Sequence, residues 1–141
     1  SPDGDSMAFL SNKDDPAGKR YDLFVGRPGG TEFRSLLQGV RFDEEALGYV
    51  WDPAGRFLIA AREEGANGAL VAVRADGGAS IDLGFDSQQN LHPDLVLLEG
   101  GDVARLVWTA KNPNAREGAD YRVTWRADLD IGKLKAALGI K

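Results

Sequence analysis

Side chains that commonly perform catalysis or bind metal ions are few in this sequence. The 141 residues include no cysteine and one histidine, His92, so thiolate chemistry and a histidine-rich metal centre are excluded. A Ser-His-Asp triad would need His92, but no serine lies in a Gly-x-Ser-x-Gly elbow. The sequence therefore predicts no catalytic residue, and a turn or strand-edge position for His92. The serines are Ser1, Ser6, Ser11, Ser35, Ser80 and Ser87.

Neither the acidic residues nor the glycines form a recognisable ion-binding motif. Asp3 and Asp5 flank Gly4, and a second acidic pair, Asp14 and Asp15, lies in the next loop. These carboxylates could bind calcium, but their spacing matches no calcium-binding loop and no distal glutamate follows. Turn capping by Asp3 and solvation of the loop acids are favoured, with a weak calcium site as the alternative. The paired glycines lack the context of a phosphate-binding loop, so we expect neither a metal ion nor a cofactor.

Charge and hydropathy argue against two classes of partner. The 17 lysines and arginines are outnumbered by 22 aspartates and glutamates, which gives a net charge of −5 and disfavours nucleic acid or an anionic membrane surface as the main partner. No apolar run approaches the roughly 18 residues that a membrane-spanning helix needs, so no membrane insertion is expected. The composition is typical of globular proteins, and residues 1–141 fit a single domain.

An internal repeat organises the chain. Ser-Pro-Asp-Gly at the start of the chain precedes an apolar strand, and Asp-Pro-Ala-Gly at residues 52–55 precedes another. Pro2 and Pro53 are 51 positions apart, as are Gly4 and Gly55. Proline presets φ near −65° and glycine accepts a positive φ, so both segments are typical of tight turns. The expected structural residues of these turns are Pro2, Asp3, Gly4, Pro53 and Gly55.

Each repeat predicts four short antiparallel strands, as in one blade of a β-propeller. The units are approximately residues 1–41, 42–86 and 87–128; the first lacks its innermost strand, and the third is recognisable mainly by its strand pattern. We therefore expect an all-β fold, a partial propeller of about three four-stranded blades. The alternative is a meandering β-sandwich with similar turns.

A short helix is expected after the third unit, over residues 129–139. Ile131, Leu134 and Leu138 have helical spacing. Asp130 is placed to act as the N-cap and Gly139 to end the helix. The chain therefore finishes with a helix in place of a further strand.

The motifs of the first unit resemble the WD-like repeat of TolB-type β-propellers. They are Ser-Pro-Asp-Gly at residues 1–4, Met-Ala-Phe-Leu-Ser-Asn at 7–12, Asp-Leu-Phe-Val at 22–25 and Gly-Gly at 29–30. The second unit keeps the proline and the last glycine of the turn, and the third keeps mainly the strand pattern. The resemblance implies a scaffold found largely outside the cytoplasm, in which the propeller binds or gates and performs no bond chemistry.

The resemblance implies a non-catalytic protein-binding scaffold that is periplasmic or extracellular. The alternative is a gating propeller of a prolyl-oligopeptidase-like serine hydrolase whose catalytic domain is absent from this chain. A third hypothesis is carbohydrate binding by exposed aromatics. Because closed propellers have about four to eight blades, the expected partner is another protein or the rest of a longer propeller chain, or a second copy that completes a six-bladed ring.

Three tryptophans, Trp51, Trp108 and Trp125, lie in apolar strands and are expected to pack between blades. Trp125 is the best candidate among them for a ligand contact.

Three long charged loops occupy the same place in successive repeats, between the second and third strands of each blade. Loops at equivalent positions in repeats emerge on the same side of the assembly, where surface loops often bind partners. The sequence therefore predicts a row of charged loops as a recognition surface, with solvated loops as the alternative. The candidate partner-binding residues are Lys13, Asp14 and Asp15, then Arg62, Glu63 and Glu64, and then Lys111, Arg116 and Glu117.

Overall fold

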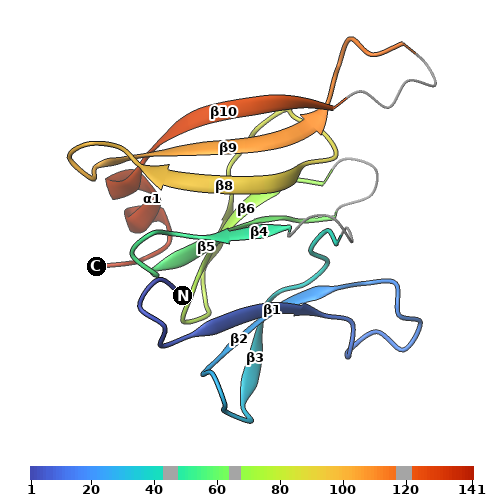
Figure 1. Cartoon of the computed structure of the whole chain (residues 1–141), viewed down its shortest axis with the longest axis vertical. Helices are drawn as coiled ribbons and strands as arrows, with labels where there is room; N and C mark the ends of the chain where they lie inside the picture. Colours follow the sequence, from blue (N-terminus) through green and yellow to red (C-terminus); the bar gives the residue numbers. More distant parts are fainter. Residues whose placement is uncertain (43–47, 64–67, 117–121) are drawn as a thin grey trace.

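The chain forms three antiparallel β-sheets stacked face to face, followed by one short helix (Figure 1). The computed structural model describes residues 1–42, 48–63, 68–116 and 122–141. The first sheet contains β1 (Met7–Ser11), β2 (Asp22–Gly26) and β3 (Phe33–Leu37). The middle sheet contains β4 (Tyr49–Trp51), β5 (Phe57–Ala61), β6 (Leu70–Arg74) and β7 (Ser80–Asp82). The third sheet contains β8 (Leu91–Leu97), β9 (Val103–Lys111) and β10 (Arg122–Asp130), and α1 (Ile131–Ala137) follows it.

The all-β prediction is confirmed, and the middle sheet has the four strands expected of a full unit; the first sheet has three, as expected for a unit without its innermost strand. The first and third sheets have three strands each in the described part of the chain. The first sheet begins with β1, which follows the turn at residues 1–4 just as β5 follows the turn at residues 52–55. The third sheet has no strand beyond β10 because the chain there enters α1.

One tight turn recurs at the same place in all three sheets. In each turn the amide of a glycine donates to the carbonyl oxygen three residues earlier, at 3.0, 2.7 and 3.0 Å for Gly4, Gly55 and Gly101. Their φ values of 80°, 72° and 75° lie in the left-handed region that glycine adopts without strain. The first two turns lie side by side, since a Cβ added to Gly55 would be 3.7 Å from Cδ of Pro2. The sequence repeat is therefore a structural repeat as well.

Both faces of the middle sheet are buried. Phe57 and Ile59 of β5 face the third sheet, whereas Leu58 and Ala60 face the first, because side chains alternate along a strand. The core on the first-sheet side includes Leu23, and Trp51 packs against it. Continuous apolar runs such as β5 are typical of strands covered on both sides.

The third sheet contributes the largest buried side chain, Trp108, which is 1% exposed. Its ring is stacked on Trp125 of β10, with 6.2 Å between the ring centroids, and packs against Phe85 at 4.7 Å. Both tryptophans therefore pack in the apolar core between the middle and third sheets. The indole Nε1–H of Trp108 donates to Oγ of Ser87 at 3.0 Å, so this buried donor is paired.

Helix α1 packs its apolar side into the same core through Ile131, Leu134 and Leu138. The side chain of Asp130 accepts a hydrogen bond from the amide of Lys133 at 2.9 Å, as an N-cap does. The helix begins two residues later than the expected 129, because the strand β10 continues to Asp130 through its ladder with β9.

The face of the first sheet that points away from the middle sheet is aromatic. Phe9 of β1 is stacked on Phe24 of β2, with centroids 5.6 Å apart, and meets Phe33 of β3 edge to face at 5.0 Å. Met7 lies on the same side of β1 and is 39% exposed. No strand of the described residues pairs with the other edge of β1, although the hydroxyl of Tyr49 donates to the carbonyl oxygen of Ala8 at 2.9 Å.

Truncation of Trp108 and Phe9 should separate the buried core from the open aromatic face. We expect Trp108→Ala to lower the free energy of unfolding by about 3–5 kcal/mol, because a fully buried ring and its contacts are lost. Phe9→Ala should cost about 1–3 kcal/mol, because the ring is only partly buried. Urea titration followed by circular dichroism measures both. If both substitutions lower the free energy of unfolding by the same amount, the face that carries Phe9 is covered.

Candidate functional site

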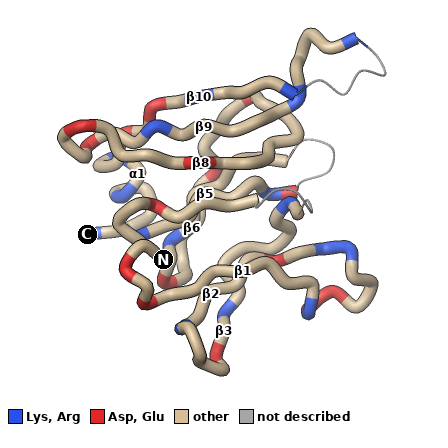
Figure 2. Tube along the Cα trace, viewed as in Figure 1, with Lys and Arg blue, Asp and Glu red and all other residues tan. Residues whose placement is uncertain are grey.

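The described parts of the three charged loops emerge at the same end of the stack of sheets (Figure 1). This end follows β1, β5 and β9, as the repeat predicts. Figure 2 shows basic and acidic residues close together along the loop between β1 and β2. Glu64 and Glu117, two of the candidate residues, lie outside the described residues.

The first loop is shaped by one of its own candidate residues, Asp15. Its carboxylate accepts hydrogen bonds from the backbone amides of Arg20 at 2.6 Å, Lys19 at 2.8 Å and Ala17 at 3.1 Å. These bonds, that of the Arg20 amide first, lower the pKa of the Asp15 carboxyl. Asp15 therefore organises the loop, whereas Asp14 is exposed.

The third residue predicted in this loop, Lys13, folds back on the first sheet. Its Nζ lies 4.5 Å from the centroid of the Phe24 ring, a cation–π contact. Lys13 is exposed as a whole, so its ammonium group links the charged loops to the edge of the open aromatic face.

The second loop is tied to the segment that crosses from β3 to β4. Arg62 forms an isolated β-bridge with Val40, and the amide of Glu63 donates to the carbonyl oxygen of Gly39 at 2.5 Å. A Cβ on Gly68 would lie 2.2 Å from the carbonyl oxygen of Arg62, so only glycine fits there. Arg62 and Glu63 thus have structural backbone roles at the base of the loop, while the side chain of Glu63 is exposed.

The third loop borders a pocket of about 380 Å³, the β9–β10 pocket. Lys111, at the end of β9, and Trp125, on β10, are among its lining residues. The indole Nε1–H of Trp125 is buried and has no hydrogen-bond partner in the described residues. Arg116 is exposed in the same loop. The structure therefore places Trp125, the tryptophan favoured for a ligand contact, beside the predicted loop surface.

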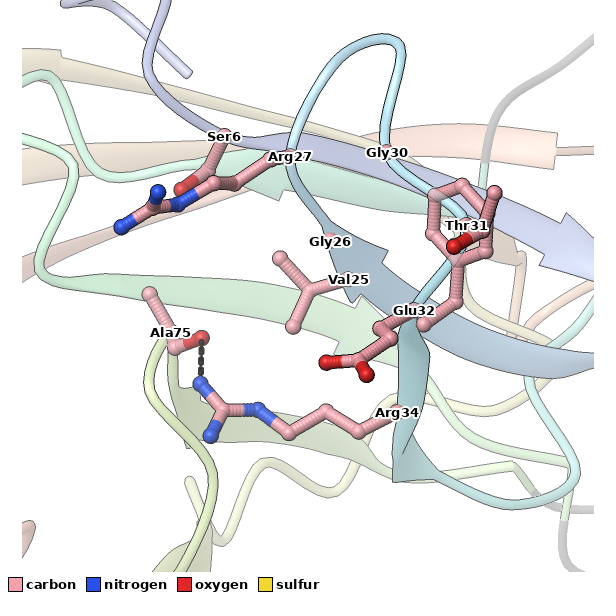
Figure 3. A pocket seen from close by; sticks show the side chains of 10 residues that line it. Ser6, Val25, Gly26, Arg27, Gly30, Thr31, Glu32, Arg34 and Ala75 are labelled. Atoms are coloured by element: carbon pink, nitrogen blue, oxygen red, sulfur yellow. Dashed lines mark hydrogen bonds between the residues drawn. The ribbon is translucent and has the colours of Figure 1, made fainter.

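A larger cleft of about 880 Å³, which sequence reasoning missed, lies between the first and middle sheets (Figure 3). Arg27, Glu32 and Arg34, which surround the hairpin between β2 and β3, line one side of it, and Ala75 lines the other. The cleft lies at the end of the stack opposite the charged loops, since Ser6, another lining residue, precedes β1. We call it the interblade cleft, where blade denotes one of the three sheets. The sequence repeat does not predict this cleft, because the cleft forms only where two sheets pack against each other.

The turn residues of the repeat form local hydrogen bonds. Asp3 accepts bonds from the hydroxyl of Ser1 at 2.5 Å and from the amide of Asp5 at 3.1 Å, and these lower the pKa of its carboxyl. Pro53 and Gly55 lie in the turn that Asp52 begins; the buried Asp52 carboxylate accepts from Nε of Arg56 at 2.6 Å. These residues shape the starts of β1 and β5.

His92 lies in β8, where the register of the ladder with β9 shifts, and it has a φ of 54°. It is exposed and occupies a strand irregularity. Within the described ranges, no three His, Asp or Glu side chains are grouped so that they could hold a metal ion. Among the residues that the structure describes, no helix is long and apolar enough to cross a membrane.

No known protein-family model matches this sequence. A search of curated proteins finds no significant match either. The function is therefore argued from the fold and the surfaces described above.

The hydrogen bonds of Asp15 predict a pH-dependent first loop. Because the folded-state pKa is lowered, the stabilisation is present above the ordinary aspartate pKa of about 3.9 and is lost as the pH falls through the lower folded value. In NMR spectra the amides of Ala17, Lys19 and Arg20 should titrate together below about pH 3.9. Asp15→Asn should shift these amides at neutral pH and abolish the titration. Titration of the three amides above the ordinary value would contradict this role.

Proposed function

We propose that the three sheets are successive blades of a TolB-type β-propeller, and that the protein is a non-catalytic scaffold that binds other proteins. The resemblance of the first unit supports a periplasmic or extracellular setting. Three features of the molecule support the propeller: consecutive antiparallel meanders, one recurring turn, and sheets stacked on one another.

The observation that carries the proposal is the equivalence of three sheet faces. Counted from the recurring glycine, Phe9 of β1 corresponds to Ala60 of β5 and Leu106 of β9. Ala60 faces the first sheet and Leu106 faces the middle sheet, and both are buried. In each case the covering sheet is the preceding one in the chain. The aromatic face with Phe9 is therefore the surface on which a further blade would pack.

The open face of the third sheet bears on the identity of that further blade. It carries the ion pair of Arg105 with Asp128, in which Nε and Oδ1 are 2.7 Å apart, together with Arg126. A six-bladed ring of two copies would press this charged face against the aromatic face of Phe9, which costs desolvation free energy. The charged face thus favours another protein or the rest of a longer propeller chain over a second copy.

The row of charged loops is the proposed recognition surface. The loops carry both signs of charge close together, and their bases are fixed by backbone hydrogen bonds at Asp15 and Glu63. Loops held by a rigid scaffold are common binding sites in repeat proteins. We infer that a partner protein contacts the exposed side chains of Asp14, Glu63, Lys111 and Arg116.

The open aromatic face gives the most direct test. The chain alone should bind the apolar dye ANS and self-associate, as measured by light scattering at several concentrations, because Met7 is exposed and Phe9 and Phe33 are only partly buried on this face, and exposed apolar surface attracts apolar partners. Met7→Lys should reduce both, since it places a charge on this face at an already exposed position.

The matched control is Val96→Lys. Val96 is 55% exposed and lies on the open face of the third sheet, so the same charge there should change neither dye binding nor mass. A well-folded monomer that binds no ANS would show that no further blade is needed, and the propeller proposal would be wrong.

A further inference from the structure

We propose that the interblade cleft binds an acidic segment of a partner protein, with Arg27 and Arg34 as the carboxylate-binding residues. This site is at the opposite end of the stack from the charged loops, and it goes beyond the scaffold function proposed above. Both sheets that form the cleft belong to this chain, so the site is complete whatever number of blades forms the propeller.

The first observation concerns which arginines are already neutralised. Neither Arg27 nor Arg34 forms an ion pair with a carboxylate in the described part of the chain, although the charge of Arg34 contributes, after the hydrogen bond from Arg74, to lowering the pKa of the nearby Asp76 carboxyl. Arg34 forms one long hydrogen bond, from Nη2 to the carbonyl oxygen of Ala75 at 3.4 Å. Four other arginines each donate two bonds from the guanidinium to one aspartate: Arg20 to Asp22, Arg56 to Asp52, Arg74 to Asp76 and Arg105 to Asp128.

The second observation is that these two arginines line the same cleft. Figure 3 shows their guanidinium groups on either side of Val25, with Arg27 on the first-sheet side and Arg34 beside Ala75. Guanidinium groups bind carboxylates through two parallel hydrogen bonds, which gives both affinity and orientation. In a protein of net charge −5, two guanidinium groups without an ion pair at one cleft point to an anionic ligand.

The shape and lining of the cleft favour a peptide. Val25 is buried and forms an apolar surface between the arginines, and Phe33 provides a second apolar contact. An extended peptide presents alternate side chains on one side, so acidic side chains at alternate positions would face the two arginines of the lining together. The volume of about 880 Å³ is also larger than one carboxylic acid needs.

Glu32 is the one acidic residue that lines the cleft. Its carboxylate points toward the space between Val25 and Arg34 (Figure 3), where it opposes an acidic ligand. The lining therefore carries two positive charges and one negative charge. Glu32→Gln should tighten the binding of an acidic peptide, because one repulsive charge is removed.

The test is fluorescence anisotropy of the full chain with a labelled octapeptide of alternating glutamate and alanine, at low ionic strength. The wild-type chain should bind it and should not bind the matched glutamine-alanine peptide. The double variant Arg27→Gln, Arg34→Gln should weaken binding about tenfold or more, as expected for lost charge-assisted hydrogen bonds. Added salt should weaken the wild-type interaction.

Two controls separate the site from general charge effects. The double variant Arg126→Gln, Lys133→Gln removes the same charge from exposed positions outside the cleft, and it should change affinity less than about twofold, since screening limits distant charges. Glutarate has two carboxylates but no peptide backbone, so it should compete only at far higher concentration. The proposal is overturned if the wild-type chain does not bind the glutamate peptide, if the two double variants weaken binding equally, or if glutarate binds as tightly as the peptide. Circular dichroism of each variant checks that the fold is kept, and Glu32→Gln provides a gain of affinity that misfolding cannot mimic.

Discussion

The apolar strands at the centre of the molecule constrain everything around them. β5 is apolar at all positions and β6 at all but its last, Arg74, so neither face of the middle sheet can remain in water. Each fully buried Leu, Ile, Val or Phe side chain contributes about 1.5–3 kcal/mol relative to exposure. The first sheet covers one face, and the third sheet together with α1 covers the other. The outer sheets therefore need only one apolar face each, and their remaining faces can differ.

As a result, the outer face of the first sheet and the outer face of the third sheet differ. The open face of the third sheet is polar and carries the ion pair of Arg105 with Asp128, while that of the first sheet carries a cluster of phenylalanines. Charge commonly protects the exposed edges and faces of β-sheets; the open face of the third sheet carries an ion pair, whereas that of the first sheet has only the ammonium group of Lys13 over the Phe24 ring. The two outer faces are thus not equivalent: that of the third sheet resembles a protein surface, and that of the first sheet resembles a protein interior.

Much of the fold could be predicted because its signals are local. Proline and glycine fix the turns at Gly4 and Gly55, and apolar runs directly after them predict the strands β1 and β5; the N-cap Asp130 was also visible in the sequence. The first residue of α1 was not, because it depends on how far the ladder with β9 extends. The interblade cleft was also hidden, since Arg34 and Ala75 are 41 positions apart and meet only when two sheets pack. Of the loop residues, Asp15 turned out to organise its loop, which its spacing to Arg20 did not reveal.

The pairing of every strand with its neighbour in sequence has a consequence for how the chain folds. Closing a short loop costs little entropy, so each hairpin can form by itself. The contacts that join residues distant in sequence are those between sheets, such as the bond from Tyr49 to Ala8. Sheet docking, and not strand pairing, is then the step that carries the larger entropic barrier. The middle sheet, apolar on both sides, is the species most exposed to misassociation until its two neighbours have docked.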